Sequence, residues 1–104
     1  FATFLIYDDF SEAIQMANDN SFGLVGYVWT SHLHKANQAM RQLRTGTVWV
    51  NTPVARDLRS AFGGYRQSGI GREGGKGCMA LYTEEKTCMV AVENVPIRRM
   101  GVGG

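Results

Sequence analysis

Apolar positions along this chain form short strand-like runs that alternate with segments of helical periodicity. Residues 3–7 (TFLIY), 23–30 (GLVGYVWT) and 47–51 (TVWVN) are typical of buried strands. Residues 12–17 and 33–44 instead place their apolar side chains at helical spacing. The resulting β-α-β-α-β order predicts an α/β fold with parallel strands.

Polar residues at the ends of the two helical segments predict where each helix begins and ends. Ser11 and Ser31 directly precede the apolar periodicity, so we expect them to be the N-caps. Arg41 and Arg44 would lie in the last turn of the second helix, where cations suit the helix dipole. Gly46 is placed to follow its C-terminus.

The second half of the chain begins with a long polar and glycine-rich loop, residues 52–71. Long loops in compact domains are commonly functional, so this loop is the first candidate for a site. A short helix over 72–82 and a strand over Lys86–Val92 follow. That strand is apolar on both faces and needs cover on both sides. We therefore divide the chain into residues 1–85 and a strand with an irregular tail, 86–104.

The composition is that of an ordinary folded protein. The chain has 104 residues, of which 44% are hydrophobic and 19% charged, which indicates one domain or a piece of a larger one. No apolar run is long enough to cross a bilayer, and no charged-then-apolar segment among these residues predicts export. The first residue is Phe1 and lies directly before strand-like sequence, so we expect the chain to be a fragment.

Charge is unevenly distributed although the net charge is only +2. Residues 1–20 contain four acidic residues and no basic one, whereas residues 35–72 contain seven basic residues against Asp57 alone. A basic centre can meet phosphates, nucleic acid or carboxylates. Charges on helix faces and helix ends would explain several of these side chains equally well.

The cysteines and histidines do not have the spacing of a metal site. Cys78 and Cys88 lie ten residues apart without a CxxC motif, and His32 and His34 do not share a helical face. Two free thiols are compatible with a reducing cytoplasm, which is the location we expect. We expect Cys78 to be a small buried apolar residue.

Residues 69–74 form a GxGxxG motif, and the acidic Glu93 follows about twenty residues later. A dinucleotide-binding fingerprint needs a hydrophobic strand immediately before its first glycine. Residues 62–68 have loop character instead. The glycines are explained equally well by turns and by close approach of the backbone.

A nucleic-acid-binding module is the other alternative for this basic, glycine-rich loop. It would combine the basic centre with Phe62 and Tyr65 as stacking residues. Such a module needs several aromatic residues on one exposed sheet face. Tyr27, Trp29 and Trp49 lie within apolar strand-like runs instead, where we expect them to belong to the core.

The order and spacing of several motifs resemble the C-terminal segment of the NAD(P)-dependent aldehyde dehydrogenases. These motifs are AND at 17–19, FGL at 22–24, YVWT at 27–30, GTVWVN at 46–51, FGGY at 62–65, QSGIGRE at 67–73 and LYTE at 81–84. A finer resemblance is to the branch that oxidises 5-carboxymethyl-2-hydroxymuconate semialdehyde. It is carried by NT at 51–52, RDLR at 56–59 and PIRRMGV at 96–102.

This resemblance implies the C-terminal part of a catalytic domain. The whole protein would oxidise an aldehyde to the acid with NAD or NADP, through a thiohemiacetal on a cysteine upstream of Phe1. The general base and cofactor turn would also lie upstream, so the fragment alone would be inactive and Cys78 would not replace the nucleophile. Lys86–Val92 would join a neighbouring subunit's sheet in a homodimer or homotetramer. We expect the protein to bind neither a membrane nor nucleic acid.

The resemblance also assigns roles within the loop. Phe62 corresponds to an aromatic residue that lines the substrate channel beside the nicotinamide, and it could also be a core residue beside the Gly-Gly turn. Arg56 and Arg59 fall in the substrate-entry loop, where a guanidinium group suits a carboxylated aldehyde. Either arginine could instead pair with Asp57 or contact another subunit.

Three further positions have family counterparts. Glu73 corresponds to a glutamate with a relay role towards the nucleophile in the betaine-aldehyde branch. It could equally be a carboxylate in the first turn of the following helix. The carbonyl groups of Arg66 and Gly69 correspond to ligands of a monovalent cation, and a backbone role survives the arginine that replaces the usual lysine.

Overall fold

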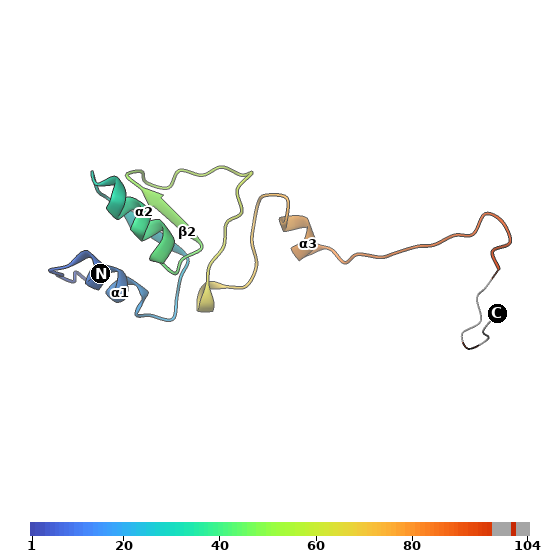
Figure 1. Cartoon of the computed structure of the whole chain (residues 1–104), viewed down its shortest axis with the longest axis horizontal. Coiled ribbons are helices and arrows are strands. Elements are labelled where there is room, and N and C mark those ends of the chain that lie inside the picture. Colours follow the sequence, from blue (N-terminus) through green and yellow to red (C-terminus); the bar gives the residue numbers. More distant parts are fainter. Residues whose placement is uncertain (97–100, 102–104) are drawn as a thin grey trace.

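The computed structural model describes residues 1–96 and 101, and it consists of a packed region and an extended one (Figure 1). The packed region contains the helices and strands up to α3, and the chain then runs away from it. The radius of gyration is 23.4 Å, whereas a compact domain of this length has about 13 Å. The extended region accounts for the difference.

The centre of the packed region is one β-α-β unit. Strand β1 (Val25–Val28) pairs in parallel with β2 (Thr47–Val50), and helix α2 (Leu33–Gln42) connects them. Parallel strands require such a crossover, so the predicted α/β class and parallel pairing are confirmed. Tyr27 lies opposite Trp49, and their rings stack with centroids 5.1 Å apart.

A small core lies between the helices. Helix α1 (Phe10–Asn18) packs against α2, and the buried hydrophobic side chains of the described residues are Ile14, Ala36 and Ala39. Trp29 is 66% exposed and Tyr27 is 46% exposed, so the prediction that they belong to the core is wrong. The chain by itself therefore leaves exposed several large aromatic side chains that a larger core would bury.

Helix α1 begins one residue before the predicted N-cap. Asp9 occupies the cap position, so Ser11 lies inside the first turn and its predicted role is wrong. The Glu12 carboxylate accepts a hydrogen bond from the backbone N–H of Asp8 at 3.2 Å. This carboxylate reaches back to the chain before the helix, much as the glutamate of a capping box does.

Helix α2 also begins at a different residue from the one predicted. His32, and not Ser31, occupies the N-cap position. The Thr30 hydroxyl accepts a hydrogen bond from the backbone N–H of His32 at 3.0 Å, and this turn fixes the entry into the helix.

The C-terminus of α2 is held by a side chain from α1. The Asn18 side chain donates to the carbonyl of Gln42 and accepts from the N–H of Arg44, both at 2.8 Å. Arg41 lies in the last turn as predicted, whereas Arg44 lies beyond the helix. Gly46 leads directly into β2 and lies three residues beyond the C-cap Leu43, so the prediction that it follows the C-terminus of the helix is wrong.

Two predicted strands are absent from the described structure. Residues 3–7 and 86–92 have no strand assignment, and Phe4 is 89% and Val90 84% exposed. A strand requires a hydrogen-bonded neighbour, and neither segment has one within the described chain. The strand predicted at residues 3–7 is therefore wrong for the chain by itself, whereas the pairing of Lys86–Val92 with another subunit remains a prediction.

The predicted helix over 72–82 is reduced to α3 (Cys78–Tyr82). Gly74 and Gly75 have φ angles of +70° and +65°, which a right-handed helix cannot contain. The boundary predicted after residue 85 remains a prediction, and most of the motif at 96–102 falls outside the described residues. None of the helices in residues 1–96 has the length and apolar character that a bilayer crossing requires.

Candidate functional site

Two side chains fix the start of the loop that follows β2, namely Trp49 on the strand and Asn51 directly after it. The Trp49 indole N–H donates to the carbonyl of Ala55 at 2.7 Å. The Asn51 amide accepts from the N–H of Thr30 at 2.8 Å and donates to its carbonyl at 2.7 Å. The Asn51 backbone N–H donates to Val28 at 2.9 Å. The loop therefore leaves the sheet in a defined direction.

Arg59 is held by Asp57 within the loop. Its guanidinium group makes three hydrogen bonds to the Asp57 carboxylate, of 2.7, 2.9 and 3.1 Å. The Arg59 backbone N–H adds a fourth at 2.9 Å. Hydrogen bonds from the Arg59 side chain, and then from its backbone, lower the pKa of Asp57, and the same pair raises the pKa of Arg59. The alternative that an arginine of this loop pairs with Asp57 is confirmed for Arg59.

Arg56 lies against two other residues that the sequence singles out. Its guanidinium carbon is 5.5 Å from the centroid of the Phe62 ring, within the range of a cation–π contact. Its Nη2 atom is 3.9 Å from a carboxylate oxygen of Glu73. Both charged side chains are more than half exposed, so the ion pair is open to competition from a ligand.

The backbones of Phe62 and Glu73 form an isolated antiparallel bridge. Each N–H donates to the other residue's carbonyl at 2.7 Å. Glu73 lies well before the start of α3 at Cys78. The alternative that places Glu73 in the first turn of a helix is therefore wrong. A Cβ atom at Gly74 would come 2.9 Å from the Ser60 carbonyl oxygen, so a glycine keeps the two chain segments close.

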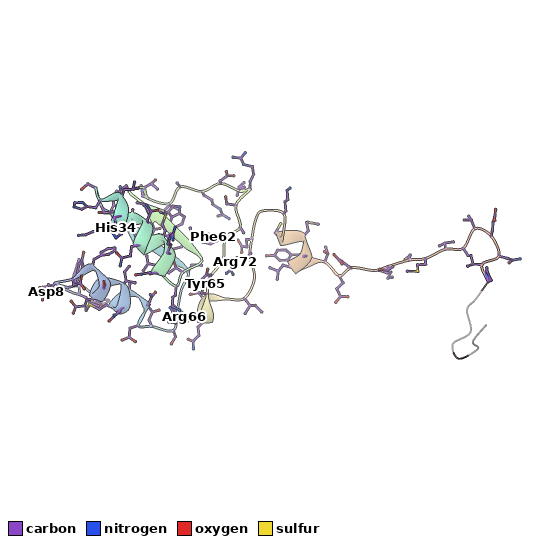
Figure 2. All side chains as sticks on the ribbon, in the orientation of Figure 1. Asp8, His34, Phe62, Tyr65, Arg66 and Arg72 are labelled. Atoms are coloured by element: carbon purple, nitrogen blue, oxygen red, sulfur yellow. The ribbon has the colours of Figure 1, made fainter. Side chains whose placement is uncertain are left out.

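Arg72 was not predicted as a site residue, yet it connects the two glycine turns. Its Nη1 atom donates to the carbonyls of Gly64 at 2.9 Å and Gly71 at 2.8 Å. The guanidinium carbon is 5.5 Å from the Tyr65 ring centroid. Phe62, Tyr65 and Arg72 are labelled together between β2 and α3 in Figure 2. The sequence signal that could have identified Arg72 is its position among several glycines.

The glycine turn docks onto the beginning of β1. The carbonyl of Gly23 accepts from the N–H of Gly46 at 3.0 Å and from that of Tyr65 at 2.8 Å. The N–H of Gly23 donates to the Ser68 hydroxyl at 2.9 Å. A Cβ atom at Gly46 would overlap the carbonyl oxygen of Gly63, so this position requires a glycine.

Arg66 is the first residue of the 3₁₀ turn η1 (Arg66–Ser68), and Gly69 follows its last residue. The Arg66 carbonyl accepts from the Gly69 N–H at 3.3 Å, and Arg66 itself has a φ angle of +53°. Its side chain donates to the carbonyls of Asn18, at 3.1 Å, and Asn20. The guanidinium thus stabilises the C-terminus of α1. The cation role of the Arg66 and Gly69 carbonyls remains a prediction.

A cavity of about 240 Å³ lies along the same turn. It is lined by Phe62, Glu73 and Tyr82 together with Gly63, Gly64, Gly69 and Gly71. The site therefore brings together Arg56, Phe62 and Glu73, of which the last two line this cavity. Arg59 is kept apart by its pairing with Asp57.

The GxGxxG motif does not have dinucleotide-binding geometry. The residues directly before Gly69 form the turn η1 and not a strand, and α3 begins only after the last glycine of the motif. Cys78 is half-buried and Cys88 exposed, both as free thiols, so the prediction of a fully buried Cys78 is wrong. Residues 1–96 also contain no group of three His, Cys, Asp or Glu side chains arranged for a metal.

Most of the chain matches one protein family. Residues 1–88 match the model described as the aldehyde dehydrogenase family. Two similar relatives are a 2-hydroxymuconic semialdehyde dehydrogenase of Pseudomonas putida and a 2-aminomuconic 6-semialdehyde dehydrogenase of a Pseudomonas species. The first is 46% identical over 81% of this chain, and the second 42% over 84%. The chain spans 17% and 18% of their lengths.

Solved structures agree in fold. An aldehyde dehydrogenase from Bacillus cereus in complex with NAD+ superposes with a TM-score of 0.74 and 40% identity, over 86% of this chain and 18% of its own. The indole-3-acetaldehyde dehydrogenase AldA of P. syringae gives a TM-score of 0.71 and 46% identity over 75% of this chain and 16% of its own.

Proposed function

Because the chain belongs to the aldehyde dehydrogenase family, we propose that the complete protein oxidises an aldehyde to the corresponding acid. The nicotinamide cofactor, NAD+ or NADP+, would supply the hydride acceptor. A cysteine thiolate outside this chain would attack the aldehyde and form a thiohemiacetal, and water would hydrolyse the thioester that remains after hydride loss. The 104 residues would contribute the wall of the substrate channel.

The open position of Arg56 is the observation that carries the substrate class. Its guanidinium group is stacked on Phe62 and has only a long, exposed contact with Glu73. A carboxylate on the substrate can form a bidentate pair with such a group. We therefore propose a carboxylated semialdehyde as substrate. The two Pseudomonas relatives are named for muconic semialdehydes, which supports this choice.

Arg59 would be a second substrate contact only for a ligand that displaces Asp57. The four hydrogen bonds between these residues favour the bound state of the pair. We therefore assign the main carboxylate contact to Arg56 and retain Arg59 as an outer one. This order follows from which guanidinium group is already occupied.

Phe62 would line the channel beside the nicotinamide. Phe62 lines the cavity and its ring contacts Arg56, which supports a wall that separates the carboxylate end from the reacting end of the substrate. We propose Glu73 as a relay group, because its carboxylate is exposed at this cavity and outside any helix. The Arg66 and Gly69 carbonyls would hold a monovalent cation at the turn below.

Residues 86–104 would form a separate oligomerisation element of the complete protein. Lys86–Val92 has strand-like sequence, and its side chains are exposed in this chain. Pairing with another subunit's sheet, in a dimer or tetramer, would satisfy its backbone and cover its apolar faces. We place the protein in the cytoplasm, where the free thiols Cys78 and Cys88 would stay reduced.

The test uses the full-length protein and two aldehydes of equal length, one with a terminal carboxylate and one with a methyl group. Formation of reduced cofactor is measured with NAD+ and with NADP+. We expect the carboxylated aldehyde to have the lower KM, by roughly ten- to a hundredfold, because a charge-assisted pair contributes about 1.5–3 kcal/mol. Equal KM values would contradict the proposed substrate class, and absence of turnover with either aldehyde would contradict the activity.

A further inference from the structure

Directly after β2, the side chain of Asn51 makes hydrogen bonds of the kind that backbone groups make within the sheet. Its amide group accepts from the N–H of Thr30 and donates to the carbonyl of Thr30, so one side chain satisfies both backbone polar groups of that residue. The backbone N–H of Asn51 still donates to Val28, as the ladder requires. The side chain of Asn51 therefore extends the contact between the two chain segments beyond the point where the backbone leaves β2.

The backbone of Asn51 makes this turn with a φ angle of +53°. Asparagine is one of the few residues other than glycine that adopts this conformation readily. Val54 also has a positive φ angle, +40°, which is unfavourable for a β-branched side chain. The start of the loop is thus held in a shape that its sequence would not adopt without fixed contacts.

Trp49 supplies a second anchor two residues earlier on the same strand. Its indole N–H binds the carbonyl of Ala55, directly before Arg56. Its ring is itself held by stacking on Tyr27. At the other end, the bridge between Phe62 and Glu73 fixes the return of the loop. Arg56 is therefore carried on a segment that is anchored on both sides.

We infer that Asn51 is a positioning residue for substrate selection: its amide clamp on Thr30 sets the direction in which the loop presents Arg56 to Phe62 and Glu73. The inference rests on the proposed function for its effect on substrate choice. The effect of the clamp on the shape of the loop, in contrast, does not rest on the proposed function. Asn51 acts through Arg56 and does not touch the substrate.

The experiment uses the full-length protein and three variants. Asn51→Gly keeps the positive φ angle but removes the amide, and Asn51→Asp keeps the acceptor for the Thr30 N–H but loses the donor. Trp49→Phe keeps the aromatic stack but removes the indole N–H. Trypsin cleavage after Arg56 and Arg59 under native conditions reports loop order without any assay of activity.

We expect Asn51→Gly to accelerate this cleavage by roughly ten- to a hundredfold, because two hydrogen bonds of about 1 kcal/mol each are lost. Asn51→Asp and Trp49→Phe should each show a smaller increase. KM for the carboxylated aldehyde should rise in the same order, while kcat for an uncarboxylated aldehyde changes less than about twofold.

A control separates the clamp from general flexibility. Val54→Gly removes an unfavourable backbone conformation from the same loop and leaves the Asn51 amide intact. If Val54→Gly matches Asn51→Gly in cleavage, or if Asn51→Gly leaves cleavage unchanged, the inference is overturned. If Asn51→Gly does not fold, Asn51→Asp and Trp49→Phe decide by the same readout. Wild-type protein without a preference for carboxylated aldehydes would contradict the proposed substrate class, while the cleavage result would still decide the role of Asn51.

Discussion

Two pairs of strand-like segments in this chain have opposite structures. Residues 25–28 and 47–50 pair with each other in a parallel sheet. Residues 3–7 and 86–92 are also rich in apolar and β-branched residues, but they are exposed and unpaired in the described structure. The difference is the presence of a partner within the chain. Strand propensity therefore indicates a need for pairing, and only the fold decides where it is met.

The same distinction separates the two arginines of the loop. Arg59 has its partner, Asp57, two residues away, and its side chain makes three hydrogen bonds to that carboxylate. Arg56 has only a long contact with Glu73 and a ring beneath it. A group that is satisfied inside the chain serves the structure, whereas one left open is available to a partner from outside. Each of the following predictions tests this division.

The largest effect is expected for the chemistry that this chain lacks. Purified residues 1–104 should show no aldehyde oxidation with NAD+ or NADP+, because the proposed nucleophile, general base and cofactor turn lie outside them. The assay follows reduced cofactor for several aldehydes, and the full-length protein is the positive control. Turnover by the fragment that disappears in Cys78→Ser would assign the nucleophile to Cys78 and contradict this prediction.

The next effect concerns the unpaired strand. In the complete protein, Val90→Lys should dissociate the oligomer, since a lysine would place a charge on an apolar face that we expect to be buried between subunits. Light scattering measures the mass, and Glu85→Lys, just before the strand, is the matched control. An unchanged mass for Val90→Lys would show that the interface lies elsewhere.

A smaller effect is expected at the loop. Arg56→Ala should raise KM for a carboxylated aldehyde by roughly ten- to a hundredfold and leave the value for a neutral aldehyde nearly unchanged. Arg59→Ala should change the same KM by less than roughly fivefold, because it removes an exposed pair. Steady-state kinetics with both aldehydes measure the two variants. Equal increases for both substrates would mean that Arg56 only shapes the loop.

The smallest effect is the pH dependence of the Asp57–Arg59 pair. The pKa of Asp57 is lowered from its ordinary value of 3.8, so the pair is fully formed above pH 3.8 and is lost as the pH falls through the lowered value. Carboxyl-carbon NMR of selectively labelled aspartates measures this titration. Arg59→Ala should return the Asp57 pKa towards 3.8, and an unchanged titration would show that the pair does not form in solution.

Sequence reasoning succeeded where the information is local. The β-α-β unit followed from apolar periodicity, whereas the roles assigned to Arg56, Phe62 and Glu73 from ordered motifs remain predictions. Helix starts were shifted because Asp9 and His32 hold the cap positions that the serines were expected to fill. The intrinsic preference for serine at an N-cap is small compared with the contacts that fix the entry of each helix.

The contacts that organise the site could not be predicted from local sequence. Asn18 binds the end of α2, Asn51 binds Thr30 and Arg72 binds Gly64, and each pair is formed only after the chain has folded back on itself. Local sequence describes the residues but not which distant carbonyl they will meet. The strands predicted at residues 3–7 and 86–92 are absent for a related reason, because the described chain contains no partner with which they could pair.

The carbonyl of Gly23, which receives both Gly46 and Tyr65, suggests an order of folding. The chain between Gly23 and Tyr65 is more than twice as long as that between Gly46 and Tyr65. Once Gly46 is docked, the second contact closes the shorter loop, and each halving of a loop saves about 0.6 kcal/mol of closure entropy. We therefore expect the β-α-β unit to form in the folding transition state and the substrate loop to condense onto it later. Substitutions at Gly46 should slow folding, whereas substitutions around Tyr65 should mainly speed unfolding.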